Sequence, residues 1–343
     1  MTRRVRTLLV GGVLFLILFV LALTLPVPYV ILSPGPTINT LGADSDGTQV
    51  IGLKGRTAKA TNGHLNLTTV LVSTDSVSVF QVLRGWLLRD EVVVPRAAEF
   101  PPGQSEKKVD QQNTQDLLDS QDSATEAALC ELGYPNGFGL RDIAATAPAA
   151  KVLKPGDMLI SLNGTSIDSF DKLSTVLQTQ RPETTVQVTV KRQSALITEP
   201  VQLIKPVAGR KGASIGVTVA DGCLAPFVVD LGLADQIGGP SAGLMFALGI
   251  IDKVGSQDLT NGAFIAGTGT IDGTGKVGPI GGIQLKMVAA RHAGATVFLA
   301  PADNCSDVRA DTPAGLKVVK VATLHEAIQD LLTLQHGGTV PHC

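Results

Sequence analysis

The sequence predicts a multidomain α+β protein with an N-terminal transmembrane helix, a β-rich region and a C-terminal αβ domain. An apolar run from Leu8 to Leu25 predicts the helix, and short alternating segments after it predict strands. In the last third of the chain, strand patterns alternate with two glycine-rich loops that each lead into a helical pattern. The 343 residues are enough for two or three domains, each with its own core.

The composition excludes some classes of partner. Charged residues make up 17% of the chain and the formal net charge is −2. We find no basic patch with interleaved aromatic residues, so we expect no nucleic-acid partner. Aromatic residues account for only 4%, so the cores must be built from aliphatic side chains.

Three arginines, Arg3, Arg4 and Arg6, precede the apolar run. The run is just long enough to cross a bilayer, whereas a cleaved signal peptide is the alternative. Ala22-Leu23-Thr24 is a poor match to a cleavage site, which favours an uncleaved anchor. The basic residues place the N-terminus in the cytoplasm. We therefore expect a single-pass protein of the cytoplasmic membrane whose C-terminal domains are extracytoplasmic.

The region that follows is predicted to be mostly strands, with two helices. Residues 76–88 have helical periodicity, and Asp75 or Ser76 could cap that helix. Residues 101–113 are polar and predict a mobile loop. Residues 114–132 predict a second helix that stops at Gly133.

Residues 133–205 contain a specific order of motifs. Gly137-Phe138-Gly139-Leu140 comes first, and a run of the form L-x-x-G-D-x-L-x-x-x-N-G follows from Leu153 to Gly164. A short helix over 169–178 and two strands, 185–191 and 196–204, complete the block.

This order resembles a PDZ domain. The resemblance implies that the loop Gly137, Phe138, Gly139 and Leu140 receives a peptide C-terminus, while the peptide adds a strand to the sheet edge. The alternative is a small αβ domain that only packs against its neighbour or positions it.

The last domain opens with strands at 214–219 and 226–231 and then a serine in a tight loop. The loop Gly238-Gly239-Pro240-Ser241-Ala242-Gly243 leads into an apolar helix that ends near Val254. Three interpretations compete: a nucleophilic serine beside an oxyanion site, a loop that cradles a phosphate, and a plain N-cap.

A second glycine-rich stretch, 266–282, leads into another helix that contains Lys286. A buried strand at 297–301 and an amphipathic helix at 324–334 follow. A nucleophilic serine needs a base, and neither His292 nor His325 lies in a motif. A lysine can serve instead if burial lowers its pKa.

Gly239-Pro240-Ser241-Ala242-Gly243 and the later Pro279-Ile280-Gly281-Gly282-x-x-x-Lys286 together resemble the proteolytic domain of Lon proteases, over about 205–338. The resemblance implies Ser241 as nucleophile and Lys286 as general base and then acid. It also places Thr268 beside the lysine. The loop residues Gly239, Pro240 and Ala242 surround the serine, with backbone N–H groups around Gly239 and Ser241 as oxyanion donors.

Two features depart from typical Lon enzymes. Gly238 stands where that family has an aspartate, and Gly275-Lys276-Val277 breaks the Walker A pattern, so we expect no ATPase.

The whole arrangement resembles the bacterial membrane-anchored PDZ-Lon family. That resemblance implies an ATP-independent serine endopeptidase that cleaves unfolded or extended proteins outside the cytoplasmic membrane. The predicted parts are an anchor at 1–26, a β-rich region at 27–132, a PDZ-like domain at 133–206, a Lon-like domain at 207–338 and a tail at 339–343.

Some alternatives stay open. An inactive scaffold or adaptor that binds peptides or membrane proteins is the main one, whereas a phosphate loop of the GHMP-kinase type leaves the lysine motif unexplained. We expect no cofactor, no nucleotide and no metal, because Asp230 and Asp235 have no histidine or cysteine at ligand spacing. Cys223 and Cys305 could pair or remain free thiols. Lon proteolytic domains usually form rings, so the resemblance also implies a possible homo-oligomer.

Overall fold

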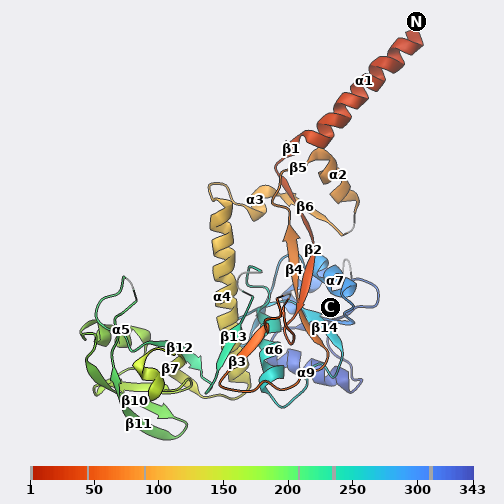
Figure 1. Cartoon of the computed structure of the whole chain (residues 1–343). Helices are drawn as coiled ribbons and strands as arrows, with labels where there is room; N and C mark the ends of the chain where they lie inside the picture. Colours follow the sequence, from red (N-terminus) through yellow and green to blue (C-terminus); the bar gives the residue numbers. More distant parts are fainter. Residues whose placement is uncertain (1–2, 45, 89, 208, 234–236, 309–311) are drawn as a thin grey trace.

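The computed structural model describes residues 3–44, 46–88, 90–207, 209–233, 237–308 and 312–343. Figure 1 shows α1 (Arg3–Thr24) projecting from a ribbon of strands that leads to the body holding the C-terminus. A second, smaller body lies to the side, and the long helix α4 (Glu106–Glu131) runs between the two. α1 has no buried residues, and it is long and apolar enough to cross a membrane. Signal sequences have the same character.

The ribbon joins α1 to the larger body. Strand β2 (Tyr29–Asn39) pairs in antiparallel fashion with β4 (His64–Val72) and with β6 (Val92–Pro95). At the α1 end, β1 (Pro26–Val27) pairs with β5 (Val77–Ser78), which leads directly into α2 (Val79–Leu87).

Ser78 caps α2 in a capping box with Gln81. The predicted cap, Asp75 or Ser76, is therefore wrong: Val77 and Ser78 extend β5 beyond both candidates.

The predicted loop at 101–113 is wrong from Glu106 onward, because α4 begins there. The Ser105 hydroxyl accepts a hydrogen bond from the Lys108 N–H and so caps the helix. The first turns are polar because they are exposed, whereas Leu117, Ala124 and Ala128 of the later turns are buried. A polar composition did not distinguish a solvated helix from a loop.

The larger body is built on one mixed sheet. Its order is β18-β17-β14-β4-β2-β6, in which β4, β14 (Phe264–Gly267), β17 (Val297–Pro301) and β18 (Lys317–Val321) are parallel. Strands from the predicted β-rich region thus complete the sheet of the predicted Lon-like domain.

Helices cover both faces of this sheet. Ile265, Leu299 and Val319 point into a core with α6 (Gly243–Val254), which α4 and α9 (Leu324–Gln335) share. The alternate positions Ala266, Phe298 and Val318 share a core with α7 (Ile283–His292). The smaller elements are α3 (Arg96–Glu99), β3 (Ile51–Lys54) paired with β13 (Val228–Leu231), β15 (Thr270–Ile271) paired with β16 (Val277–Gly278), the 3₁₀ turn η2 (Ala302–Asn304) and α8 (Cys305–Val308).

The smaller body is a second sheet with its own aliphatic core. Its order is β11-β10-β8-β7-β12, and helix α5 (Phe170–Gln178) packs on this core through Leu173. β12 falls within the predicted Lon-like domain, yet it pairs along β7. The strands are β7 (Asn136–Ile143), β8 (Met158–Leu162) with β9 (Thr165–Ser166), β10 (Thr185–Arg192), β11 (Ala195–Gln202) and β12 (Val217–Cys223), and the 3₁₀ turn η1 covers Pro148–Lys151.

Two disulfides are formed, Cys130–Cys223 and Cys305–Cys343. Both considered states of Cys223 and Cys305, paired with each other or free, are therefore wrong. Cys130 stands at the end of α4, beside the end of β12. The C-terminus returns to β18 through a bridge between Val319 and His342, which carries Cys343 to α8.

Candidate active site

Ser241, Lys286 and Thr268 meet at the carboxyl end of β14. Ser241 lies just before α6, Thr268 directly follows β14, and Lys286 is in the first turn of α7. The Lys286 Nζ lies 2.7 Å from the Ser241 Oγ and 3.0 Å from the Thr268 Oγ1. The Thr268 hydroxyl in turn donates to the Ser241 carbonyl at 3.0 Å. Because α6 and α7 cover opposite faces of the sheet, their side chains converge where β14 ends.

Lys286 is an amine held away from water. Its side chain is 3% exposed, and burial lowers its pKa to about 8. Among the described residues it forms no ion pair, so the two hydroxyls are its polar partners. At pH 7 about a tenth of such a lysine is neutral, and the neutral amine is the form that can accept a proton.

Helix α4 supports the loop that carries the serine. The Gly239 N–H donates to the Asn113 carbonyl at 2.8 Å, and the Ser120 hydroxyl donates to the Pro240 carbonyl at 2.9 Å. The Gly239 N–H is therefore already engaged here. Among the described residues, the N–H of Ser241 has no acceptor, which leaves it available as an oxyanion donor.

The same contact explains the glycine at position 238. A Cβ on Gly238 would come within 2.9 Å of the Asn113 Cβ. An aspartate there would therefore have to displace α4 or the loop. Sequence alone could not find this partnership, because nothing around Asn113 or Ser120 marks them as neighbours of a catalytic loop.

A cavity of about 450 Å³ opens in front of the serine and the lysine. One wall is the last part of β4, Thr68–Val72. β14 pairs with β4 only up to Leu67, so beyond it this side of β4 has no strand partner among the described residues. An extended chain can therefore pair there. Leu32, Pro36, Glu99, Gly281 and Gly282 also line the cavity.

The predicted peptide loop does not lie at an edge of the smaller sheet. It consists of Gly137, Phe138, Gly139 and Leu140. These residues are in β7, between β8 and β12. They offer no free edge for an added strand. The edge strands of this sheet are β11 and β12, and β12 is the one next to β7.

A cavity of about 520 Å³ lies between α5 and the start of β12. Leu173 and Leu177 of α5 face Ile215 and Val217 across it, and Lys211 adds a cation to its lining. An apolar groove beside a strand edge suits an extended peptide.

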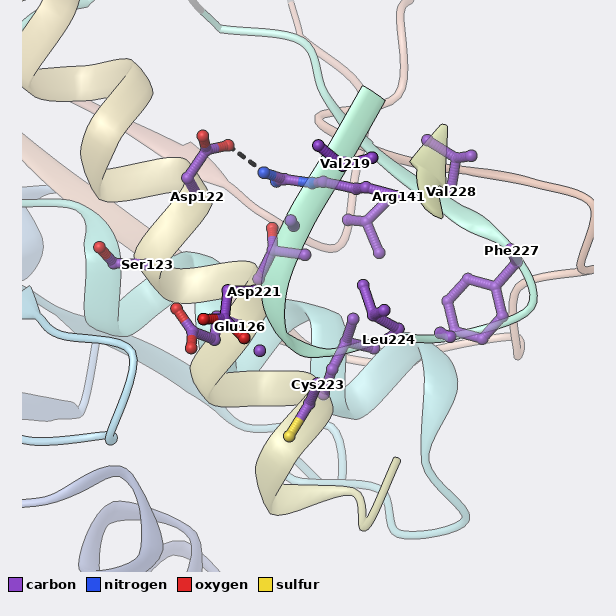
Figure 2. Close-up of a pocket in the computed structure, with 16 residues that line it drawn as sticks. Asp122, Ser123, Glu126, Arg141, Val219, Asp221, Cys223, Leu224, Phe227 and Val228 are labelled. Atoms are coloured by element: carbon purple, nitrogen blue, oxygen red, sulfur yellow. Dashed lines mark ion pairs between the residues drawn. The ribbon is translucent and has the colours of Figure 1, made fainter. Parts of the chain in front are cut away.

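Figure 2 shows a third cavity, of about 280 Å³, where α4 meets β12. Arg141 forms an ion pair with Asp122 at 2.7 Å, and Glu126 points into the same space. Burial, together with the nearby Asp221, raises the pKa of Glu126. Its lining residues include no lysine or histidine, and its titratable groups are Arg141 and the carboxylates of Asp122, Glu126 and Asp221. It forms a polar joint between the two bodies.

A metal site is not indicated. The described residues contain no group of three or more His, Cys, Asp or Glu side chains that could hold an ion. Asp230 pairs with Lys54 at 2.8 Å, His325 pairs with Glu131, and Asp235 lies outside the described residues.

Comparisons with known proteins agree with this architecture. Residues 234–334 match the family model of the Lon protease (S16) C-terminal proteolytic domain, and residues 113–203 match that of the PDZ domain. Lon protease 1 of Sorangium cellulosum is 37% identical over 100 residues, which is 28% of this chain and 12% of that protein. Lon protease of Campylobacter concisus is 35% identical over 98 residues, which is 27% of this chain and 12% of that protein.

Among solved structures, the PDZ domain of the SdrC-like protein from Listeria monocytogenes is 20% identical, with a TM-score of 0.23; the match covers 25% of this chain and 90% of that one. The chain spans about 12% of the length of the two Lon proteases. The chain therefore contains a Lon-type proteolytic domain, the kind found in serine peptidases, together with a PDZ domain.

Proposed function

We propose that this protein is an ATP-independent serine endopeptidase that uses a Ser241–Lys286 dyad. In this proposal α1 anchors it in the cytoplasmic membrane, and it cleaves unfolded or extended chains on the outer side. The observation that carries the proposal is the 2.7 Å contact between the Ser241 Oγ and a buried lysine whose pKa is lowered to about 8.

The dyad supplies the steps of acyl transfer. Neutral Lys286 takes the proton of the Ser241 hydroxyl as the Oγ attacks the scissile carbonyl. The Ser241 N–H, before α6, faces the charge that develops on the oxygen. Protonated Lys286 then gives its proton to the leaving amine, and a water activated by the same amine releases the acyl group. Thr268 holds the Nζ in line through the 3.0 Å contact.

The two disulfides support an extracytoplasmic location, because such bonds persist in oxidising compartments. ATP is scarce there, which supports ATP independence. The open side of β4 favours substrates that can enter as an extended strand. A folded domain cannot enter in this way.

The PDZ domain supplies a second contact for peptides. We place it between α5 and β12, where an extended C-terminus would pair with the edge of β12. Lys211 would attract the terminal carboxylate, and Leu173 and Leu177 would contact an apolar last side chain.

Cleavage of a labelled unfolded protein by the full chain in detergent tests the proposal. We expect cutting without nucleotide and no change on adding ATP and Mg²⁺. Ser241→Ala and Lys286→Ala should each abolish cutting, whereas the exposed control changes Ser194→Ala and Lys320→Ala should not. Cutting that survives in either dyad variant would refute the assignment, and an inactive unsubstituted protein would favour a scaffold.

A further inference from the structure

Helix α2 has an apolar face that the protein leaves uncovered. Val82 and Gly85 point inward and are buried. The rest of the helix surface carries four large apolar side chains that are 43–84% exposed: Phe80, Leu83, Trp86 and Leu87. The helical periodicity of residues 76–88 places Val79, Val82, Leu83 and Trp86 on one face, and packing of that face on a core would have buried Leu83 and Trp86.

The position of α2 on the β ribbon is fixed. A Cβ on Gly85 would come within 2.8 Å of Val93 on β6, so the helix packs closely against that strand. Arg84 pairs with Glu91 at 2.7 Å on the polar flank. Because α2 is held against β6, its uncovered apolar face points away from the β ribbon.

This face continues the surface of α1. The Val79 N–H donates to the carbonyl of Leu25, just past the end of α1. The ring of Phe80 packs edge-on against Phe19, with centroids 6.5 Å apart, in the last two turns of α1. Figure 1 shows α2 beside the foot of α1, away from both folded bodies.

We propose that α2 is a second membrane contact, which lies in the interface of the bilayer that α1 spans. What covers its apolar face is lipid, because Phe80 already touches the apolar, unburied part of α1. A short amphipathic helix with a tryptophan is the type of element that enters the boundary of headgroups and acyl chains, to a depth of about 5–10 Å. This inference rests on the proposed anchoring by α1.

Two contacts restrain the molecule more than one. A single helix lets the attached domains tilt and rotate about it. With α2 seated in the interface, the β ribbon leaves the membrane at a set angle, and the cavity at Ser241 stays at a set height.

Trp86 makes the proposal measurable, because it is the chain's one tryptophan. The full chain is reconstituted into phosphatidylcholine vesicles with bromine at a shallow or a deep acyl position. We expect blue-shifted emission that shallow bromines quench more than deep ones and that aqueous iodide barely quenches. Emission that iodide quenches freely, with no effect of bromine, would overturn the proposal. Blue-shifted emission that depends on the protein-to-lipid ratio but not on bromine would also overturn it. That result would mean that a second copy of the chain covers the apolar face of α2.

Substitutions give the matched comparison. Leu83→Gln with Leu87→Gln should move Trp86 toward water and restore iodide quenching, whereas Leu118→Gln with Leu196→Gln, at exposed positions far from α2, should change nothing. Vesicle flotation separates the two levels of the hypothesis. A chain that does not float with vesicles contradicts anchoring by α1, whereas a chain that floats with a water-exposed Trp86 contradicts only the role of α2.

Discussion

At the scale of residues, the proposed chemistry depends on one buried amine. Lys286 gains two hydroxyl contacts and no carboxylate among the described residues, so nothing offsets the cost of removing its charge from water. The burial that suits Lys286 to the proposed role of base also lowers the stability of the folded state. Both consequences can be measured.

The rate of peptide cleavage should follow the ionisation of Lys286. Because the neutral amine is the active form, kcat/KM should rise about tenfold per pH unit below pH 8 and level off above it. A rate profile of the full chain between pH 6 and about 10 checks this, with the unfolding midpoint measured alongside. A rate that falls from pH 7 to 9 while the protein stays folded would contradict the assignment of Lys286 as base.

Lys286→Met should abolish cleavage and stabilise the fold. The pKa of this lysine falls from 10.5 to about 8, so its burial costs about 3 kcal/mol of folding free energy at pH 7, where the unfolded chain carries the charge. This cost in folding free energy is fully present below the pKa of Lys286 in the folded state. It disappears above the pKa of Lys286 in the unfolded chain. We therefore expect a gain in unfolding free energy at pH 7 that shrinks as the pH passes from 8 to 10.5. A gain that is equal at both ends of that range would point to packing instead of charge.

At the scale of elements, α4 connects the two bodies. One side of it holds the serine loop through Asn113 and Ser120, and its C-terminal end is bonded to β12 by Cys130–Cys223. β12 is also the edge strand at which we place peptide binding. The helix thus contacts the serine loop and the C-terminal end of β12, the strand whose start borders the proposed peptide site.

Loss of the Cys130–Cys223 disulfide should weaken this connection. The bond closes a loop of 93 residues, so Cys130→Ser with Cys223→Ser should lower the unfolding free energy by about 2–4 kcal/mol. Denaturant unfolding of the full chain in detergent measures it. The pair Cys305→Ser with Cys343→Ser, whose separation is 38, serves as control and should cost less. An equal or smaller loss for the 130–223 pair would count against the role given to α4.

Most elements could be predicted, because their signals are local. The strand at 297–301 was predicted to the residue, and the helices at 169–178 and 324–334 within one residue at each end. Residues 106–113 of the helix at 106–131 were missed, because its exposed first turns have the polarity of a loop.

At the scale of the whole molecule, the β ribbon sets the distance between α1 and the cavity at Ser241. Figure 1 shows it running from the foot of α1 to the larger body. Leu32 and Pro36 of β2 line the cavity at Ser241. They follow the end of α1 by about 8 to 12 residues, or roughly 25–40 Å at the rise of an extended strand.

Membrane-bound substrates should therefore need an extended stalk. With a single-span substrate whose outer domain follows a flexible stalk, we expect cleavage with about 20 stalk residues and little with about 4, because the shorter stalk cannot reach Ser241. Gel analysis of co-reconstituted protease and substrate measures it, and the Ser241→Ala variant is the control. Equal cleavage of both stalks would contradict a fixed height. Self-association stays a prediction.

The sequence by itself determined which residues carry the proposed chemistry. Ser241, Lys286 and Thr268 were selected from motifs, because a serine loop and a lysine helix have local signatures, and the structure brings all three together. Only the tertiary structure decided their surroundings. The place of β4 in the sheet, the support of the loop by α4, the partners of the four cysteines and the edge position of β12 depend on contacts between distant segments. Such contacts follow from how helices and strands pack in space, and no short stretch of sequence records them.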